Sequence, residues 1–171
     1  MGGKSIEERS EIINNRVEVG HMEMDTVVGA RGTSECLLVL TDRKTRLEII
    51  RKLKSKSIEE VRKAILEIVR EYPKLIKTIT SDNGSEFMDA KFIESLGIEY
   101  FYAHSYCSYE RGSNENNNKL IRRHIPKGTN IELISDEKIK EIEDWINNYP
   151  RKLFNGKSAL DVFFENFKNI F

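Results

Sequence analysis

The feature that most limits the fold of this chain is a change in the spacing of its apolar residues near residue 57. Before it, stretches rich in aliphatic and β-branched residues lie at 21–29, 35–42 and 47–53, separated by short polar turns. They predict three strands joined in an antiparallel meander. After it, apolar residues recur at helical spacing from Ile58 to Tyr72, between a capping Ser57 and Pro73, and predict a helix.

The rest of the chain alternates between strands and helices. We expect a strand at 77–82, a short helix at 89–97 and a strand at 98–103, an order that implies parallel pairing after the meander. Further helices are expected in the second half of 110–124, at 135–149 and at 158–167. The predicted fold is α/β: a mixed sheet of five strands, three antiparallel and then two parallel, flanked by helices.

Length and composition indicate one domain without a strong global charge. With 171 residues, we expect a single core domain at 17–171, preceded by a polar leader or cloning remnant at 1–16. The 28 basic and 28 acidic residues cancel, so any contact with nucleic acid must come from local patches. No apolar run approaches the roughly 18 residues of a membrane span, and we expect a soluble protein of the cytoplasm. Cys36 and Cys107 have neither disulfide nor zinc spacing.

Two carboxylates occupy strand positions that need an explanation. Asp25 lies within an apolar strand, where a charge is costly unless it is paired, hydrogen-bonded or metal-bound. It can also be explained by hydrogen bonds near a strand end or by a register that turns it to solvent. Asp82 ends the strand at 77–82, and Asp-Asn-Gly is a favourable turn sequence, so a turn role alone accounts for it as well.

A third acid, Glu115, lies in a stretch of uncertain helicity. If this stretch is helical, Glu115, Lys119 and Arg122 share one face. Such a face could hold a metal ion at one end and DNA phosphates along the rest. The simpler alternative is a solvated face with an ordinary Glu–Lys pair.

Four segments taken together resemble a known family. These are GHMEMDTVVG, TITSDNGSEF, ERGSNENNNKLIRRHIPKGT and INNYPRKLFNGKSALDVF, in this order from about Arg16 to Phe167. They are similar to the catalytic core of bacterial insertion-sequence transposases of the group numbered thirty, which are Asp-Asp-Glu recombinases like the retroviral integrases. The resemblance implies a ribonuclease H-like fold. Such transposases also carry an N-terminal helix-turn-helix region, which we do not expect in this chain.

The resemblance also implies an active site and a reaction. Its acidic triad corresponds to Asp25, Asp82 and Glu115, with a spacing of 33 positions between the last two. The triad is expected to bind two Mg²⁺ or Mn²⁺ ions, with Asp25 and Asp82 as principal ligands and Glu115 on the second ion. The implied enzyme is a DNA transposase that cleaves element ends with water and transfers them to target DNA through a 3′-hydroxyl. DNA, namely terminal repeats and a target duplex, is the implied partner, with a homodimer or higher multimer acting on the bacterial nucleoid.

Other residues are expected to support this site or to bind DNA. Asn83 and Gly84 allow the chain to turn so that Asp82 faces the metals, and Glu23 and Glu86 lie close to the triad. Phosphate contacts are expected from two basic runs, at Lys119, Arg122, Arg123 and Lys127, and at Arg43 and Lys44. Two alternatives stay open: a metal-dependent nuclease without strand transfer, and an inactive DNA-binding remnant of a decayed element.

Overall fold

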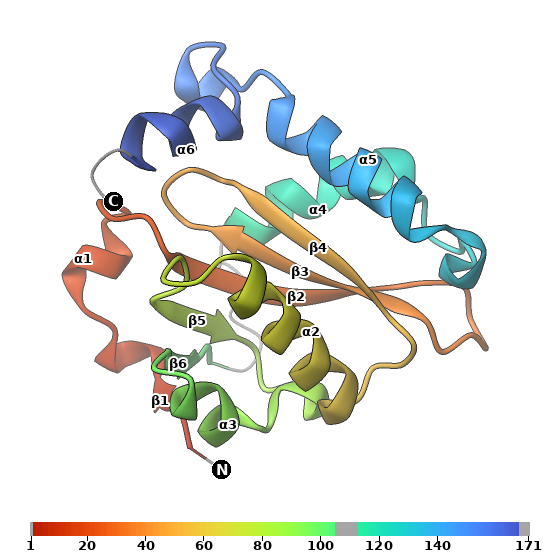
Figure 1. Cartoon of the computed structure of the whole chain (residues 1–171), viewed down its shortest axis with the longest axis horizontal. Coiled ribbons are helices and arrows are strands. Elements are labelled where there is room, and N and C mark those ends of the chain that lie inside the picture. Colours follow the sequence, from red (N-terminus) through yellow and green to blue (C-terminus); the bar gives the residue numbers. More distant parts are fainter. Residues whose placement is uncertain (1, 105–112, 168–171) are drawn as a thin grey trace.

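A mixed six-stranded sheet runs through the molecule in the order β1-β6-β5-β2-β3-β4 (Figure 1). The computed structural model describes residues 2–104 and 113–167, with the backbone alone at 113–117 and 167. The strands are β1 (Lys4–Ser5), β2 (His21–Val28), β3 (Cys36–Asp42), β4 (Glu48–Leu53), β5 (Thr78–Ser81) and β6 (Glu99–Tyr102). β2, β3 and β4 pair antiparallel, whereas β5 pairs parallel with β2 and β6. The predicted mixed sheet is confirmed, except that it has six strands, because β1 adds parallel to β6.

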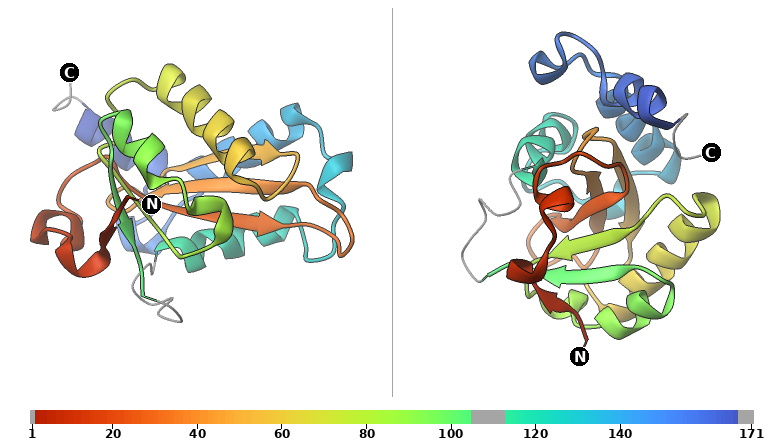
Figure 2. Two further views of the ribbon diagram at one scale, coloured as in Figure 1. Left: turned by 90° about the horizontal axis from the view of Figure 1, so that it is seen from below. Right: turned by 90° about the vertical axis from the view of Figure 1, so that its left-hand side faces the viewer.

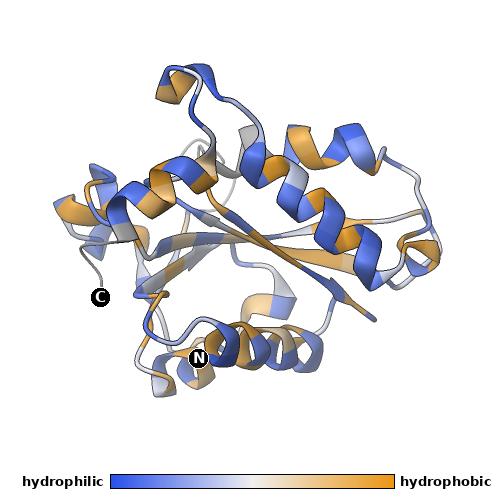
Figure 3. Cartoon of the chain, turned by 45° about the horizontal axis from the view of Figure 1, so that its top comes forward, coloured by the Kyte–Doolittle hydropathy of each residue, from blue (hydrophilic) through white to orange (hydrophobic). Residues whose placement is uncertain are grey.

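Helices cover both faces of this sheet (Figures 1 and 2). They are α1 (Glu11–Asn14), α2 (Ile58–Glu71), α3 (Ala90–Ser95), α4 (Ser113–His124), α5 (Asp136–Asn148) and α6 (Ala159–Phe167). Short 3-10 turns are η1 (Ile6–Glu8), η2 (Ser85–Phe87), η4 (Ile131–Leu133) and η5 (Lys152–Phe154). In Figure 1, α2 lies in front of the sheet and α4 behind it. The hydropathy colouring shows stripes along the helices, as expected where one face of each is buried (Figure 3).

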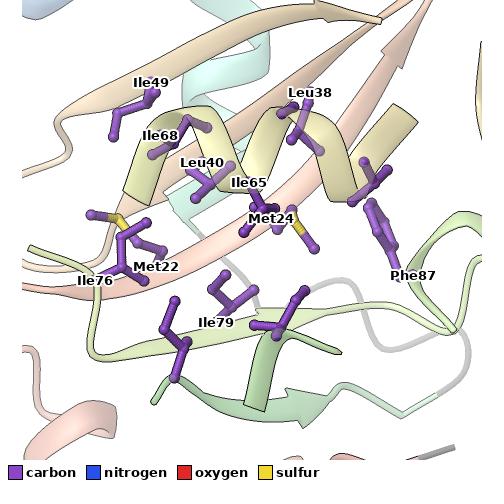
Figure 4. Close-up of a cluster of buried hydrophobic side chains, with 14 of the residues drawn as sticks. Met22, Met24, Leu38, Leu40, Ile49, Ile65, Ile68, Ile76, Ile79 and Phe87 are labelled. Atoms are coloured by element: carbon purple, nitrogen blue, oxygen red, sulfur yellow. The ribbon is translucent and has the colours of Figure 1, made fainter. Parts of the chain in front are cut away.

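The α2 side of the sheet holds the larger core. The helix begins where the Ser57 hydroxyl accepts the Glu60 N–H, at 3.4 Å. Its buried residues Ile65 and Ile68 pack on side chains that point from every second position of the strands. These strand residues include Met22, Met24, Leu38, Leu40 and Ile79 (Figure 4). The even-numbered residues of β2 therefore face α2.

The opposite face of the sheet packs against α4 and α5. The odd-numbered Val27 of β2 and Leu37 and Val39 of β3 join Leu120 and Ile121 of α4 in this second core. From α5 come Ile139, Ile142 and Ile146. Odd-numbered residues of β2, including Asp25, therefore belong to the side of the sheet that α4 covers.

Side chains of α5 cap the outer edge of β4. Glu143 Oε2 accepts the Ile50 N–H at 2.8 Å, and Asn147 both accepts the Glu48 N–H, at 2.8 Å, and donates to the Glu48 carbonyl, at 2.9 Å. Backbone groups that an edge strand would leave open are thus paired. The same bonds fix α5 rigidly against the sheet.

The segment before residue 17, predicted as a polar leader or cloning remnant, forms structure that packs on the domain. Lys4 and Ser5 pair with Phe101 and Tyr102 of β6, and Figure 2 shows this segment (red) beside β6 (green). Ile6 and Ile13 are buried. Among the described residues, no helix is long and apolar enough to cross a membrane.

Candidate active site

Asp25 and Asp82 occupy equivalent positions on neighbouring parallel strands. The β2–β5 register pairs His21 with Thr78 and Glu23 with Thr80. Asp25 follows Glu23 by two residues, and Asp82 follows Thr80 by two, just after β5 ends. Neighbouring strands lie about 4.8 Å apart, so continuing this register beyond the last paired residues puts Asp25 and Asp82 side by side, at the edge of the sheet formed by the carboxyl end of β5. Both are half-buried.

Asp25 is held from its own strand and from α4. Its Oδ1 accepts the Thr26 N–H at 2.9 Å, and its Oδ2 accepts an amide hydrogen of Asn118 at 3.1 Å. Glu115 lies three residues before Asn118 in α4, which is close to one helical turn. The Glu115 side chain is outside the described residues, but its backbone position puts it on the helix that contacts Asp25.

Hydrogen bonds from Asn83 and Gly84 fix the turn after β5. The Gly84 N–H donates to Asp82 Oδ1 at 2.8 Å, and the Asn83 amide donates to the carbonyl of Ala103, at 3.1 Å. A Cβ on Gly84 would lie 2.7 Å from Glu86 Oε2 and 3.0 Å from Asp82 Oδ1. A larger residue at position 84 would therefore require the carboxylates of Glu86 and Asp82 to shift.

Glu86 supports this turn from the core side. Its side chain is buried, and its Oε1 accepts the Thr26 hydroxyl at 3.1 Å and lies 3.5 Å from Lys56 Nζ. Thr26 is an even-numbered residue of β2, so its side chain lies on the opposite face of the sheet from that of Asp25. Glu86 thus links the Asp82 turn to β2 from behind the acids. Sequence pattern does not single out Thr26, Lys56 or Asn118, because only the fold brings the first two to Glu86 and the third to Asp25.

Glu23 and Arg43 form an ion pair inside the molecule. Arg43 Nη1 donates to Glu23 Oε1, and Arg43 Nε donates to the carbonyl of Ile13 at 3.2 Å. The side chain of Arg43 is 4% exposed and that of Glu23 is 0% exposed. DNA cannot reach Arg43 in the interior. The expectation that Arg43 contacts DNA phosphates is therefore wrong. Its neighbour Lys44 donates to the carbonyl of Val17, at 3.0 Å.

The predicted cations of α4 and the loop after it differ in accessibility. Lys119, Arg123 and Lys127 are exposed. Arg122 is half-buried and donates to the carbonyl oxygens of Val28, at 3.2 Å, and Ile125, at 3.4 Å. Burial lowers the pKa of the Arg122 guanidinium. Arg122 therefore ties α4 to the end of β2, and the three exposed cations are the ones that can reach a ligand.

The donor chemistry at this edge fits a hard divalent cation. Asp25 and Asp82 offer carboxylate oxygens, the ligands that Mg²⁺ and Mn²⁺ prefer. Among side chains that the structure describes, no group of three Asp, Glu, His or Cys residues forms a complete metal site. A third ligand would have to come from elsewhere, and Glu115 lies on α4, the helix whose Asn118 contacts Asp25.

Comparisons with known proteins agree with this architecture. The integrase core domain family matches residues 17–108. The chain is 43% identical, over 94% of its length, to a probable transposase for insertion-like sequence element IS1161 of Streptococcus salivarius. It is 40% identical, over 88%, to the transposase for IS4351 of Bacteroides fragilis, and 32% identical, over 95%, to the transposase InsI for IS30C of Escherichia coli. These matches cover 46%, 46% and 42% of the three relatives, so the chain spans about half their length.

A solved structure shares the fold. The catalytic core domain of BIV integrase superposes with a TM-score of 0.65 at 16% identity, covering 89% of this chain and 98% of that one. The predicted ribonuclease H-like fold and the resemblance to the catalytic core of bacterial insertion-sequence transposases are confirmed. On the match over more than half of its residues, this chain belongs to the integrase core domain family.

Proposed function

We propose that this chain is the catalytic core of a DNA transposase that cleaves the ends of a mobile element and joins them to target DNA. The observation that carries the proposal is the shared position of Asp25 and Asp82 on adjacent parallel strands, beside the helix that contains Glu115. Together they would supply the oxygen donors for two Mg²⁺ or Mn²⁺ ions. Bound metal would activate the attacking oxygen and stabilise the charge on the leaving oxygen.

The chain's own residues prepare this site. The Asn118 amide and the Thr26 N–H orient the Asp25 carboxylate, and the Gly84 N–H orients that of Asp82. Each donor occupies one carboxylate oxygen without neutralising the charge, so both acids keep the negative charge that a cation needs. In this scheme Asn83, Gly84, Glu86 and the buried Glu23 are supporting residues and not ligands.

We infer that DNA lies across the edge of the sheet where the acids meet and along the exposed side of α4. Lys119, Arg123 and Lys127 would contact phosphates there, and such contacts position DNA without reading its sequence. Lys44 would contribute from a more distant surface. The core would span residues 17–171, with the segment before residue 17 packed on it. It would act in the bacterial cytoplasm on the nucleoid and pair two DNA ends as a dimer or higher multimer.

Strand transfer with defined DNA tests the proposal. The chain is incubated with Mg²⁺ or Mn²⁺, a labelled pre-cleaved element end and a target duplex. We expect joined products that disappear with Asp25→Asn, Asp82→Asn and Glu115→Gln. Cleavage without joining would instead identify a nuclease, and the absence of any metal-dependent product would identify an inactive DNA-binding remnant.

A further inference from the structure

A cluster of aromatic rings lies at the junction of α4 and α5. Trp145, the only tryptophan of the chain, is 40% exposed. Its ring centroid lies 4.4 Å from that of His124, in an edge-to-face arrangement, and 4.9 Å from that of Tyr149. Trp145 and Tyr149 also line an open hollow of about 430 Å³, together with Glu141, Asp144, Asn148 and Pro150. The hollow is large enough for a nucleotide.

The cluster is held rigidly, so a ligand would meet a preformed surface. The neighbours of Trp145 in α5, Ile142 and Ile146, are buried in the core. Glu143 and Asn147, on the same helix, bond the backbone of β4. Little ordering would accompany binding, which favours recognition of a flat, rigid ligand.

Exposed cations of α4 lie beside the rings and one helical turn before them. Arg123 Nη1 donates to the Tyr149 hydroxyl at 3.2 Å, and its guanidinium lies 5.4 Å from the centre of that ring. Lys119 lies one helical turn earlier on α4, and both cations are exposed. Two acids line the hollow, but Lys138 lies 3.3 Å from Glu141 and Lys140 lies 3.3 Å from Asp144. The surroundings therefore suit a ligand with a negative backbone and an aromatic face.

We propose that this cluster, which we call the Trp145 platform (His124, Trp145 and Tyr149, with Arg123), stacks an unpaired base of the DNA strand next to the reacting phosphate. This inference rests on the proposed function. Asn118, which contacts Asp25, lies six residues before His124. This separation corresponds to a rise of about 9 Å along α4, similar to the length of two or three nucleotide steps in one DNA strand. A base must be unpaired to offer its ring face, because duplex bases already stack on one another. Stacking of this kind tolerates any base.

Fluorescence of the single tryptophan tests the platform directly. The full chain is titrated, without metal, with a single-stranded oligonucleotide of about 10 nucleotides and with an abasic oligonucleotide of the same length. We expect the normal oligonucleotide to quench Trp145 emission and the abasic one to leave it nearly unchanged. Trp145→Ala should weaken binding of a labelled oligonucleotide about 10-fold with an unchanged salt slope, because it removes stacking and not a phosphate contact.

Matched variants separate stacking from other effects. Phe164→Ala removes an aromatic side chain, 57% exposed, from the neighbouring helix α6, and should leave DNA affinity unchanged. Arg123→Ala should reduce the salt slope as well as the affinity. Unchanged Trp145 emission at saturating oligonucleotide would overturn the inference. An emission change on concentrating the protein without DNA would overturn it too, because it would show that a second copy of the chain covers the platform. Because no cleavage is required, quenching without strand transfer would count against the proposed function alone, and strand transfer without quenching against the platform alone.

Discussion

The Thr26 hydroxyl donates to Glu86 Oε1 at 3.1 Å and thereby joins the strand of Asp25 to the turn of Asp82. The carboxylate is almost fully buried, with Lys56 Nζ 3.5 Å away. This link connects the two segments that carry Asp25 and Asp82, from the side of β2 opposite to Asp25. Outer-shell contacts of this kind tune metal affinity without touching the ion.

Thr26→Val should therefore weaken divalent-metal binding. The substitution keeps the shape of the side chain but removes the hydroxyl and leaves a buried carboxylate oxygen with one donor fewer. We expect the dissociation constant for Mn²⁺ to rise about 10-fold, within the range known for outer-shell changes. Calorimetric titration of metal-free protein measures it. Thr33→Val, which removes a hydroxyl bonded to the Ala30 carbonyl on an exposed hairpin, is the control, and equal affinities in both variants would contradict the role of Thr26.

Asp82→Asn should separate metal binding from folding. An asparagine Oδ1 can still accept the Gly84 N–H, so the turn is expected to survive. Removing one of two neighbouring charges relieves repulsion in the metal-free protein. We expect an unfolding temperature that is unchanged or slightly higher without metal, together with loss of the rise that we expect Mg²⁺ to cause in the wild type. An Asp82→Asn variant that Mg²⁺ still stabilises as strongly as wild type would rule Asp82 out as a ligand.

The sequence predicted those parts of the fold and site that depend on local pattern. Strand alternation and helical spacing defined the sheet and α2, and the resemblance singled out Asp25 and Asp82. The prediction that Arg43 binds DNA was wrong. Arg43 lies in a basic run of the sequence, but it faces inward because the β3–β4 turn brings it over Glu23. The burial of Ile6 and Ile13, before residue 17, could not be predicted either, because two apolar residues are too few to indicate it. Both depend on contacts between distant segments, which periodicity does not encode.

The Glu23–Arg43 pair should contribute strongly to stability only while both partners are present. Arg43→Met removes the ion-pair partner of the buried Glu23 carboxylate, and we expect the free energy of unfolding to fall by about 3–5 kcal/mol. A Glu23→Leu/Arg43→Met double variant should recover much of this loss, since it removes both charges. Urea denaturation measures these differences. Lys44→Met, at the next and more exposed position, should change stability by less than about 1 kcal/mol, and a similar loss there would show that the effect is not specific to the pair.

His21 should make stability depend on pH near neutrality. Burial lowers the pKa of its imidazole, outweighing the opposite effect of Glu18, and Nδ1 lies 2.9 Å from the Thr78 hydroxyl. The unfolded chain takes up the proton at about pH 6.5, whereas the folded chain takes it up only at lower pH. The stabilisation from neutral His21 is therefore complete above the unfolded pKa and is lost as the pH falls through 6.5 toward the folded pKa, by at most about 1.4 kcal/mol per pH unit.

Urea denaturation between pH 5.5 and pH 8 checks this dependence. His21→Gln should be less stable at every pH, because a buried ring is lost, but its stability should fall less steeply on acidification than that of the wild type. His124→Gln, at an exposed position on α4, should keep the wild-type slope. If His21→Gln and the wild type lose stability in parallel below pH 7, the pH dependence arises from other groups and the buried imidazole does not control it.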